Sequence, residues 1–538
     1  MIQGVIFSGW TRMRDNRLQY LLWGAVVALG IGLRLPDLRH RPMHTDEAVH
    51  AVKLGVLLET GESTYDAREY HGPTLNVFTR IPAWIRGQST FADLDEATLR
   101  IIPVCFGLLL ILLSPLLVPL IGRNAALASA LWIAVSPVQA YYSRYYIQET
   151  LFVCFAFALL VLVFRYLRAR RWIWALGAGV ALGMLHATKE TDILVLGAAA
   201  AAGSAVWLDE RIRRPSVARS TGRLKTMHGL IFLLAAVLVA GFFFSSFFTK
   251  PGGFLDSFRT YRTYFHRGTG QTLHVHPWYY YFRLLFFFHV PGKPVWSEAW
   301  FLPFAFLGAH RVFRHSGRAE GDPKSGFGRF LVVYTLVLGA VFSSIPYKTP
   351  WNVLGFHHGL LLLAGLGTAE LFHAVKNRNR KAGVVALLAV SLSAMAGQAV
   401  LLNRTYDSDP CNPWVYAHPG PDVHRISETV EAAAAAGPDG LRTHVEVVVP
   451  GHGYWPLPWT LRRLKNVGWY DAVDLRVPAA PIVLVAPERE PALVRKLYDL
   501  PPPGQRHLYL RLWEGYAELR PAVEIRGYIR KDLHDLSH

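Results

Sequence analysis

Hydrophobic residues along this chain lie in long uninterrupted runs rather than at the alternating spacing of a soluble domain. A run of about 17 to 24 apolar residues is long enough to cross a hydrocarbon core roughly 30 Å thick as a helix. We expect eleven such spans, at residues 20–36, 101–121, 124–141, 149–167, 173–187, 192–208, 228–248, 298–313, 330–346, 353–372 and 382–402. The pattern therefore predicts a multi-pass membrane protein with an all-α membrane domain.

Three long polar segments lie outside these runs, at residues 37–99, 249–297 and 403–538. The last contains two runs rich in β-branched residues, 444–450 and 481–487, separated by a Trp/Pro-rich stretch and followed by a helix-like segment at 488–500. Such alternation is typical of an α/β domain. We therefore expect two parts, a membrane domain over 1–402 with large loops 37–99 and 249–297, and a smaller α/β domain over 403–538.

The 538 residues include 56 Lys and Arg against 38 Asp and Glu, a net charge of +18. In a soluble protein this excess would suggest a nucleic-acid partner. If the N-terminus is cytoplasmic, however, the inner segments 1–19, 122–123, 165–172, 209–227, 310–329 and 374–382 hold 23 of the basic residues against five acidic ones, which is the whole excess. This distribution follows the positive-inside rule. It predicts a cell-membrane protein with a cytoplasmic N-terminus and an extracytoplasmic C-terminal domain, and no nucleic-acid partner.

The first outer loop carries two adjacent carboxylates, Asp46 and Glu47, within HTDEAVHA (44–51). Close to the membrane, such a pair suits general-base catalysis or the binding of a divalent ion. A structural alternative is helix capping, with Thr45 or Asp46 as the N-cap of an amphipathic helix. The two interpretations are compatible, since a carboxylate at a helix start can serve in both roles.

A second polar cluster, AYYSRYYIQET (140–150), falls between the third and fourth predicted spans. Arg144 lies between two Tyr pairs, and Glu149 begins the next helix. The planar guanidinium of Arg144 suits the phosphate of a lipid-linked substrate. The alternative is an interfacial anchor within an aromatic belt.

Two further motifs fall on the same predicted surface. HATKETD (186–192) supplies Lys189, and PYKTPWN (346–352) supplies Lys348. For each of them an interfacial anchor or a loop ion pair is an equally good explanation. In the second outer loop, His274 and His276 are weak evidence for a metal site, because two histidines at this spacing are more often part of a solvated loop. The shared surface is what makes these motifs candidates for one site.

Six motifs together resemble a known family. They are DEAVHA (46–51), HGPT (71–74), YYSRYYIQE (141–149), ATKETD (187–192), YKTPW (347–351) and YWPLPW (454–459). They and the arrangement of spans and loops resemble the GT-C membrane glycosyltransferases, including the protein mannosyltransferases and the aminoarabinose lipid A transferases. The motifs are most similar to the flippase-activity-associated membrane proteins of surface-glycan assembly.

The resemblance implies an enzyme that transfers a hexose or pentose from a polyprenyl-phosphate-linked donor to a glycan, lipid or protein acceptor on the outer face of the membrane. It implies Asp46 as the catalytic aspartate, Glu47 as its support and Glu149 as a second acidic residue. It places Arg144 and Lys189 on the carrier phosphate. The other implied substrate-binding residues are Tyr145, His71, Lys348 and Trp351.

The metal-dependent oligosaccharyltransferase branch of that superfamily differs from this chain in one respect, because no DxD or ExD triplet follows the third predicted span. We therefore expect no metal ligands, no cofactor and an inverting transfer without metal. Two other classes stay open: a transporter or flippase-associated component that handles lipid-linked glycans, and a non-catalytic glycan-binding subunit. Transporters place ionisable groups near the bilayer midplane, whereas the candidate residues here fall near span ends.

Overall fold

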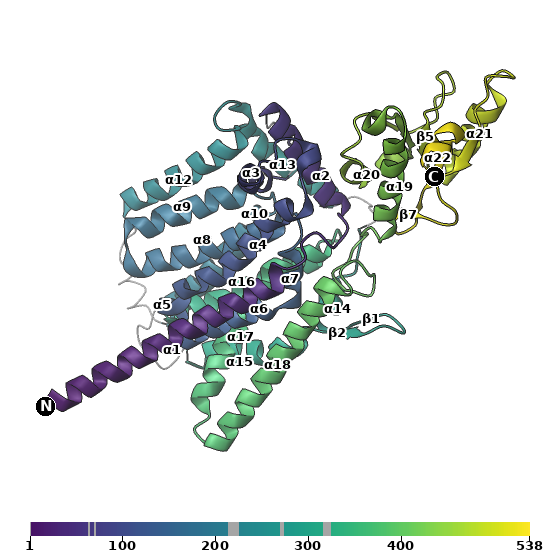
Figure 1. Cartoon of the computed structure of the whole chain (residues 1–538). Coiled ribbons are helices and arrows are strands. Elements are labelled where there is room, and N and C mark those ends of the chain that lie inside the picture. Colours follow the sequence, from purple (N-terminus) through teal and green to yellow (C-terminus); the bar gives the residue numbers. More distant parts are fainter. Residues whose placement is uncertain are drawn as a thin grey trace.

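The computed structural model describes residues 2–62, 65–68, 71–213, 225–268, 274–315 and 324–537. A large helical body is followed by a smaller part that contains most of the strands (Figure 1). The start of α1 (Ile2–Arg34) and the C-terminal part lie at opposite ends of this body (Figure 1).

Six helical segments of the described chain are long and apolar enough to cross a membrane. They are Glu96–Ile121, Glu149–Ala169, Asp192–Ile212, Thr226–Phe244, Gly326–Ser344 and Arg378–Arg404. They correspond to α4 (Glu96–Leu113) with the short α5 (Val118–Ile121), α8 (Glu149–Ala169), α10 (Asp192–Arg213), α12 (Thr226–Phe244), α16 (Lys324–Ser344) and α18 (Arg378–Arg404). The protein is therefore a membrane protein, as the sequence predicts.

Each of the eleven predicted spans coincides with helical structure. Six of them correspond to the candidate spans above, and the helices at the other five are shorter or less apolar. The additional helices are α1, α6 (Arg123–Val135) with α7 (Pro137–Tyr142), α9 (Trp172–His186), α15 (Leu302–His315) and α17 (Leu354–Ala374). The predicted span 124–141 is divided because Pro137 has no N–H to donate, and Ser136 instead caps α7 through the N–H of Gln139. That all eleven cross the membrane stays a prediction.

The core of the body is built around α17, which packs between α15 and α6. Small residues allow this approach: a Cβ added to Gly367 would lie 1.8 Å from the carbonyl oxygen of Phe304 on α15. Inside a membrane the hydrophobic effect does not drive helices together. Helices there associate through close packing of this kind.

The predicted outer loops form short helices at one end of the body. The first contains α2 (Thr45–Thr60) and α3 (Thr74–Ile85), and the second contains α13 (Gly252–Gly268), α14 (Tyr280–Phe286) and the two-residue strands β1 (Phe288–His289) and β2 (Val295–Trp296). The prediction that Thr45 or Asp46 is the N-cap of the first loop helix is wrong by one or two residues. The N-cap of α2 is His44, because its Nδ1 accepts the N–H of Asp46 at 3.0 Å.

The C-terminal part is a mixed sheet with helices against it, in the strand order β4-β3-β5-β9-β6. The strands are β3 (Val445–Val448), β4 (Val467–Tyr470), β5 (Ile482–Val485), β6 (Tyr509–Arg511) and β9 (Arg526–Arg530), with a separate pair β7 (Glu518–Arg520) and β8 (Val523–Glu524). Helices α19 (Asp422–Ala436), α21 (Glu490–Val494) and α22 (Lys531–Ser537) accompany them. The two predicted strand runs become β3 and β5, which are buried and pair in parallel.

The Trp/Pro-rich stretch joins this part to the first outer loop through α20 (Leu457–Thr460). The indole N–H of Trp459 donates to Glu96 Oε1 at 2.8 Å, and Arg462 Nε donates to the carbonyl of Leu94 at 3.0 Å. The Arg462 guanidinium lies 3.9 Å from the Trp459 ring centroid. These contacts hold the C-terminal part at the end of the body where α4 begins.

Candidate active site

A cavity of about 320 Å³ lies at the end of the body where α8 and α10 begin and α16 ends. Because these three helices contain candidate spans, the cavity lies at one end of those spans rather than midway along them. Its lining comes from four separate parts of the chain: Asp46, Val49, His50, Lys53, Arg68 and His71; Ile147, Gln148 and Glu149; Lys189, Glu190 and Thr191; and Tyr264, Phe342, Ile345, Tyr347, Thr349, Trp351 and Asn352.

The two adjacent carboxylates of the first loop have separate environments. The start of α2 is a capping box, in which Glu47 Oε2 accepts the backbone N–H of the N-cap His44 at 3.1 Å. Glu47 therefore points back to the helix start, whereas Asp46 lines the cavity. Capping is thus the role of Glu47 and not of Asp46.

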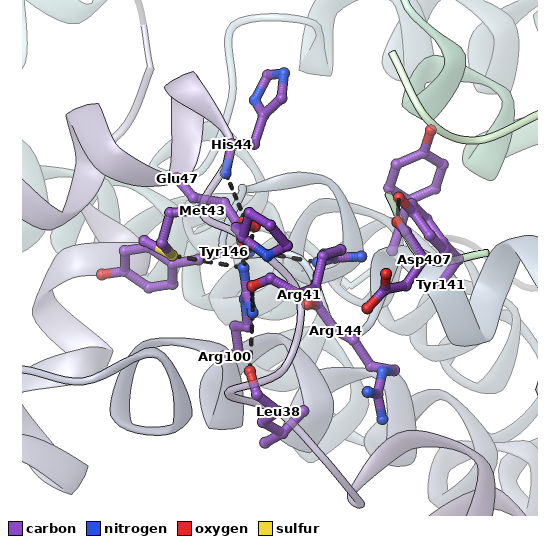
Figure 2. Close-up of polar contacts among 12 residues, drawn as sticks. Leu38, Arg41, Met43, His44, Glu47, Arg100, Tyr141, Arg144, Tyr146 and Asp407 are labelled. Atoms are coloured by element: carbon purple, nitrogen blue, oxygen red, sulfur yellow. Dashed lines mark hydrogen bonds and ion pairs between the residues drawn. The ribbon is translucent and has the colours of Figure 1, made fainter. Parts of the chain in front are cut away.

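Glu47 lies in a fully buried ion-pair cluster (Figure 2). Arg100 donates Nε to Oε1 and Nη2 to Oε2, both at 2.8 Å, and the backbone N–H of Tyr146 donates to Oε1 at 2.8 Å. Arg41 Nη2 lies 3.8 Å from Glu47 Oε1. Burial alone would raise the pKa of Glu47, but the charge and hydrogen bonds of Arg100 outweigh it and hold the pKa well below its usual range. Glu47 stays ionised and does not line the cavity, so its proposed catalytic support is at most indirect.

Asp46 is the second residue of α2, and its side chain is 45% exposed. Its carboxylate lies 3.9 Å from His44 Nδ1, which accepts the backbone N–H of Asp46 and so carries no proton to neutralise it. A carboxylate that lines a cavity with so little neutralisation can accept a proton from a bound ligand.

Glu149 and Lys189 form a buried ion pair on the cavity wall, with Lys189 Nζ 2.6 Å from Glu149 Oε1. Lys189 also lies 3.4 Å from Asn352 Oδ1. Burial would lower the pKa of Lys189, but the charges of Glu149 and Glu190 raise it above its usual value, so the amine stays charged. The second carboxylate oxygen of Glu149 is buried and has no hydrogen-bond partner among the described residues.

The predicted motifs HGPT (71–74) and ATKETD (187–192) lie against each other. Gly72 donates its N–H to the carbonyl of Thr188 at 3.1 Å, and His71 Nδ1 lies 3.1 Å from Glu190 Oε2. The approach needs glycine, because a Cβ on Gly72 would lie 2.0 Å from the carbonyl oxygen of Ala187. This backbone contact places His71 beside Lys189 in the cavity.

Three other predicted substrate-binding residues lie outside the lining. Arg144 is buried and donates to the backbone carbonyls of Arg34, at 3.0 Å, and of Pro36 and Asp37. Tyr145 is buried under the Arg41 guanidinium, 4.5 Å from the ring centroid. Lys348 donates to the carbonyls of His276 and Ile345. In this conformation Arg144 and Lys348 hold segments of backbone together, and the predicted substrate contacts of all three residues stay predictions. Trp351 does line the cavity.

The sequence reasoning did not single out several lining residues. His50 follows Asp46 by four residues on α2, and Lys53 follows it by seven. This spacing places the three side chains on one helix face and could have identified Lys53. Arg68, Tyr264 and the oxygen of Asn352 had no comparable signal in the sequence. Burial and the nearby charges of Lys53, His71 and Lys189 lower the pKa of His50 well below its usual value, so it is neutral at pH 7.

The histidines of the second outer loop lie elsewhere. His274 Nδ1 and His276 Nε2 contact the hydroxyl of Tyr416, at 2.6 and 3.3 Å. In the described part of the chain, no three His, Cys, Asp or Glu side chains are grouped as metal ligands. Metal-free chemistry stays a prediction.

Comparison with known proteins gives a partial match to a family model and a shared fold with solved structures. The family model for dolichyl-phosphate-mannose-protein mannosyltransferases matches residues 76–241, which include Glu149 and Lys189 but not Asp46. No curated protein matches the chain significantly by sequence.

Solved structures share the fold over nearly the whole chain. ArnT from Cupriavidus metallidurans in the apo state has a TM-score of 0.59 at 14% identity, over 97% of this chain and 98% of that one. The same protein bound to undecaprenyl phosphate has a TM-score of 0.57 at 15% identity, over 94% and 97%. The archaeal oligosaccharyltransferase AglB from Archaeoglobus fulgidus, in complex with an inhibitory peptide and a dolichol-phosphate, has a TM-score of 0.51 at 13% identity, over 88% and 70%. Together these matches show that the chain shares its fold with these proteins, and that part of it resembles the mannosyltransferase family model.

Proposed function

We propose that the protein transfers a hexose or pentose from a polyprenyl-phosphate-linked donor to a glycan, lipid or protein acceptor at the outer membrane surface, with Asp46 as the general base. The observation that carries this proposal is the cavity itself. It combines a weakly neutralised carboxylate, Asp46, with a buried cation, Lys189, at the end of the candidate spans. The positive-inside distribution of charge supports the outer surface.

In the proposed reaction an acceptor hydroxyl attacks the anomeric carbon of the sugar and loses its proton to Asp46. The bond between the anomeric carbon and the phosphate oxygen breaks, and polyprenyl phosphate leaves with the electron pair. Attack from the face opposite the leaving group inverts the anomeric configuration. The reaction balances without an oxidant, a reductant or a resident cofactor.

The departing phosphate needs positive potential, and two features of the cavity supply it. Lys189 is charged, and the first turns of α2, α8 and α10 all begin at the cavity, through Asp46, Glu149 and Thr191. Helix N-termini favour anions because their first N–H groups have no partner within the helix. In this proposal the phosphate replaces Glu149 as the ion-pair partner of Lys189. The Glu149 carboxylate then accepts a hydrogen bond from a sugar hydroxyl.

The apolar lining suits the rest of the donor. Phe342, at the end of α16, and Ile345 continue from a candidate span into the cavity, where an isoprenoid chain arriving from the bilayer would lie. Trp351 and Tyr264 offer ring faces to the sugar.

The test uses the full-length protein reconstituted in vesicles with polyprenyl-phosphate-linked mannose, glucose and arabinose, and a membrane extract as the source of acceptors. Release of polyprenyl phosphate, measured by mass spectrometry, reports transfer. Asp46→Asn should reduce the rate by about 10²- to 10⁴-fold. The matched control is Glu62→Gln, an exposed acid of the same loop that pairs with Lys250 and does not line the cavity.

Full transfer by Asp46→Asn would exclude the base role. If no donor supports transfer but a labelled lipid-linked glycan crosses the vesicle membrane, the alternative holds, and the protein is a flippase-associated or non-catalytic component of glycan handling.

A further inference from the structure

A second cavity, of about 710 Å³, shares no lining residue with the first. Its walls come from the end of α1, the loop that leads into α2, the end of α3 and the first turns of α4. The lining residues are Leu35, Asp37, Leu38, Arg39, His40, Pro82, Ile85, Arg86, Ala97, Thr98 and Ile101. The proposed glycosyl transfer uses none of them.

The apolar wall of this second cavity continues into a surface of exposed apolar side chains. Leu35 is 43% exposed and Ile85 is 70% exposed, and both lie at the ends of helices. Beside them on α3, the Trp84 side chain is almost fully exposed. An exposed Trp next to exposed aliphatic residues is typical of the membrane–water interface. Lipid chains of the surrounding bilayer can therefore reach the cavity.

The polar rim holds two arginines that share one carboxylate. Arg39 Nη2 lies 2.6 Å from Asp95 Oδ2, and Arg86 Nη1 lies 2.9 Å from Asp95 Oδ1. Burial would raise the pKa of Asp95, but hydrogen bonds from Thr98 and Arg39 and the charge of Arg86 lower it, so Asp95 is ionised at pH 7. Two guanidinium groups against one carboxylate leave one positive charge at the rim.

The other polar groups around the rim already have partners. Asp37 Oδ2 lies 3.7 Å from Arg404 Nε, and His40 Nδ1 lies 3.0 Å from Asp407 Oδ2. Among the described residues, Arg39 and Arg86 each make their side-chain hydrogen bonds through a single nitrogen. The remaining guanidinium N–H groups suit a phosphate, whose oxygens accept parallel hydrogen bonds from such a fork.

We propose that this second cavity binds the phosphate headgroup of an anionic membrane lipid, with Arg39 and Arg86 on the phosphate and the acyl chains along Leu35, Ile85 and Ile101. A lipid is favoured over a soluble anion because most of the exposed lining is apolar and continues into the exposed side chains of Leu35 and Ile85. The loop that forms one wall ends at His44, the N-cap of the helix that carries Asp46, so the bound lipid lies next to the segment that positions the proposed base.

Native mass spectrometry of the purified full-length protein in neutral detergent tests this proposal without any sugar donor. Phosphatidylglycerol is titrated against phosphatidylcholine with the same chains. The wild type should bind phosphatidylglycerol at least fivefold more tightly. Arg39→Gln combined with Arg86→Gln should abolish that preference, since each surface arginine contributes about fivefold to the binding of an anionic lipid.

The matched control is Arg463→Gln combined with Arg476→Gln, two exposed arginines of the C-terminal part that each pair with a carboxylate, at 3.3 and 3.1 Å. This control should keep the preference for phosphatidylglycerol. If the first pair fails to fold, Arg39→Gln alone carries the test, because that side chain is 62% exposed. An equal preference in wild type and variant overturns the proposal. Displacement of phosphatidylglycerol by inorganic phosphate at an equal concentration also overturns it and assigns the site to soluble anions. Neither result depends on whether the protein transfers sugars.

Discussion

The Glu47–Arg100 cluster and the polar cavity both contain a buried ion pair, and they differ in how completely that pair is satisfied. Both carboxylate oxygens of Glu47 accept hydrogen bonds, and Arg100 also donates to the carbonyls of Leu38, Arg41 and Pro42. In the cavity, Glu149 keeps one oxygen without a partner among the described residues. A saturated network stabilises the fold, whereas an unsaturated one beside a cavity can bind a ligand.

Breaking the Glu47–Arg100 ion pair should have the largest effect, and that effect is on stability. Glu47→Gln should lower the free energy of unfolding by about 3 to 5 kcal/mol, because it leaves the Arg100 charge buried without its counter-ion. The combined change Glu47→Leu and Arg100→Met should cost less than Glu47→Gln alone. Thermal unfolding in detergent measures both, with Asp46→Asn as the neighbouring control, which should stay within about 0.5 kcal/mol of wild type. Equal destabilisation by Glu47→Gln and Asp46→Asn would contradict the comparison.

Removing the cation of the Glu149–Lys189 pair should lower activity as well as stability. Lys189→Met should reduce kcat/KM for the lipid-linked donor by about 10²-fold, since one charge-stabilising donor at a leaving group typically contributes that much. Lys189→Arg keeps the charge and should retain more of the activity. The reconstituted transfer assay measures both, and an active Lys189→Met would remove Lys189 from the phosphate site.

Acidification should destabilise the cavity region through its buried neutral histidine. The pKa of His50 is lowered in the folded protein, whereas in the unfolded chain it is about 6.5. Below pH 6.5 the unfolded chain therefore takes up a proton that the folded protein does not, and stability falls by about 1.4 kcal/mol per pH unit for this group. His50→Gln should reduce the slope of the unfolding midpoint between pH 6.5 and 5. An unchanged slope would show that His50 is not neutral in the folded state.

The smallest expected effect is that of removing divalent metal ions on the rate of transfer. Two of the three carboxylates in the cavity already have basic partners, Lys189 for Glu149 and His71 for Glu190. A chelator should therefore change the rate of transfer by less than about twofold, whereas a Lewis-acid metal would contribute several kcal/mol. Loss of activity in chelator that returns on adding Mg²⁺ or Mn²⁺ would show that the proposed metal-free reaction is wrong.

How far the site could be predicted varies from residue to residue. Asp46, Glu149, Lys189, His71 and Trp351 were candidates from their motifs, and the structure places them all on one cavity. Arg144, Tyr145 and Lys348 were candidates on the same grounds and lie outside it. The motif that contains a residue indicates which surface it reaches, but the direction of a side chain depends on partners from distant segments. The carbonyls of Arg34 and Asp37, more than 100 residues earlier in the chain, determine where the Arg144 guanidinium lies.

Some features were determined by the sequence alone. Apolar length predicted the helices of the membrane body, β-branched runs predicted β3 and β5, and these elements are local because their periodicity and hydropathy depend on neighbouring residues. The tertiary structure alone decided that Glu47 is buried in an ion pair with Arg100, while Asp46, one residue before it, lines a cavity. Adjacent residues on a helix point about 100° apart, so the packing around the helix, and not the local sequence, determines which of the two carboxylates is buried.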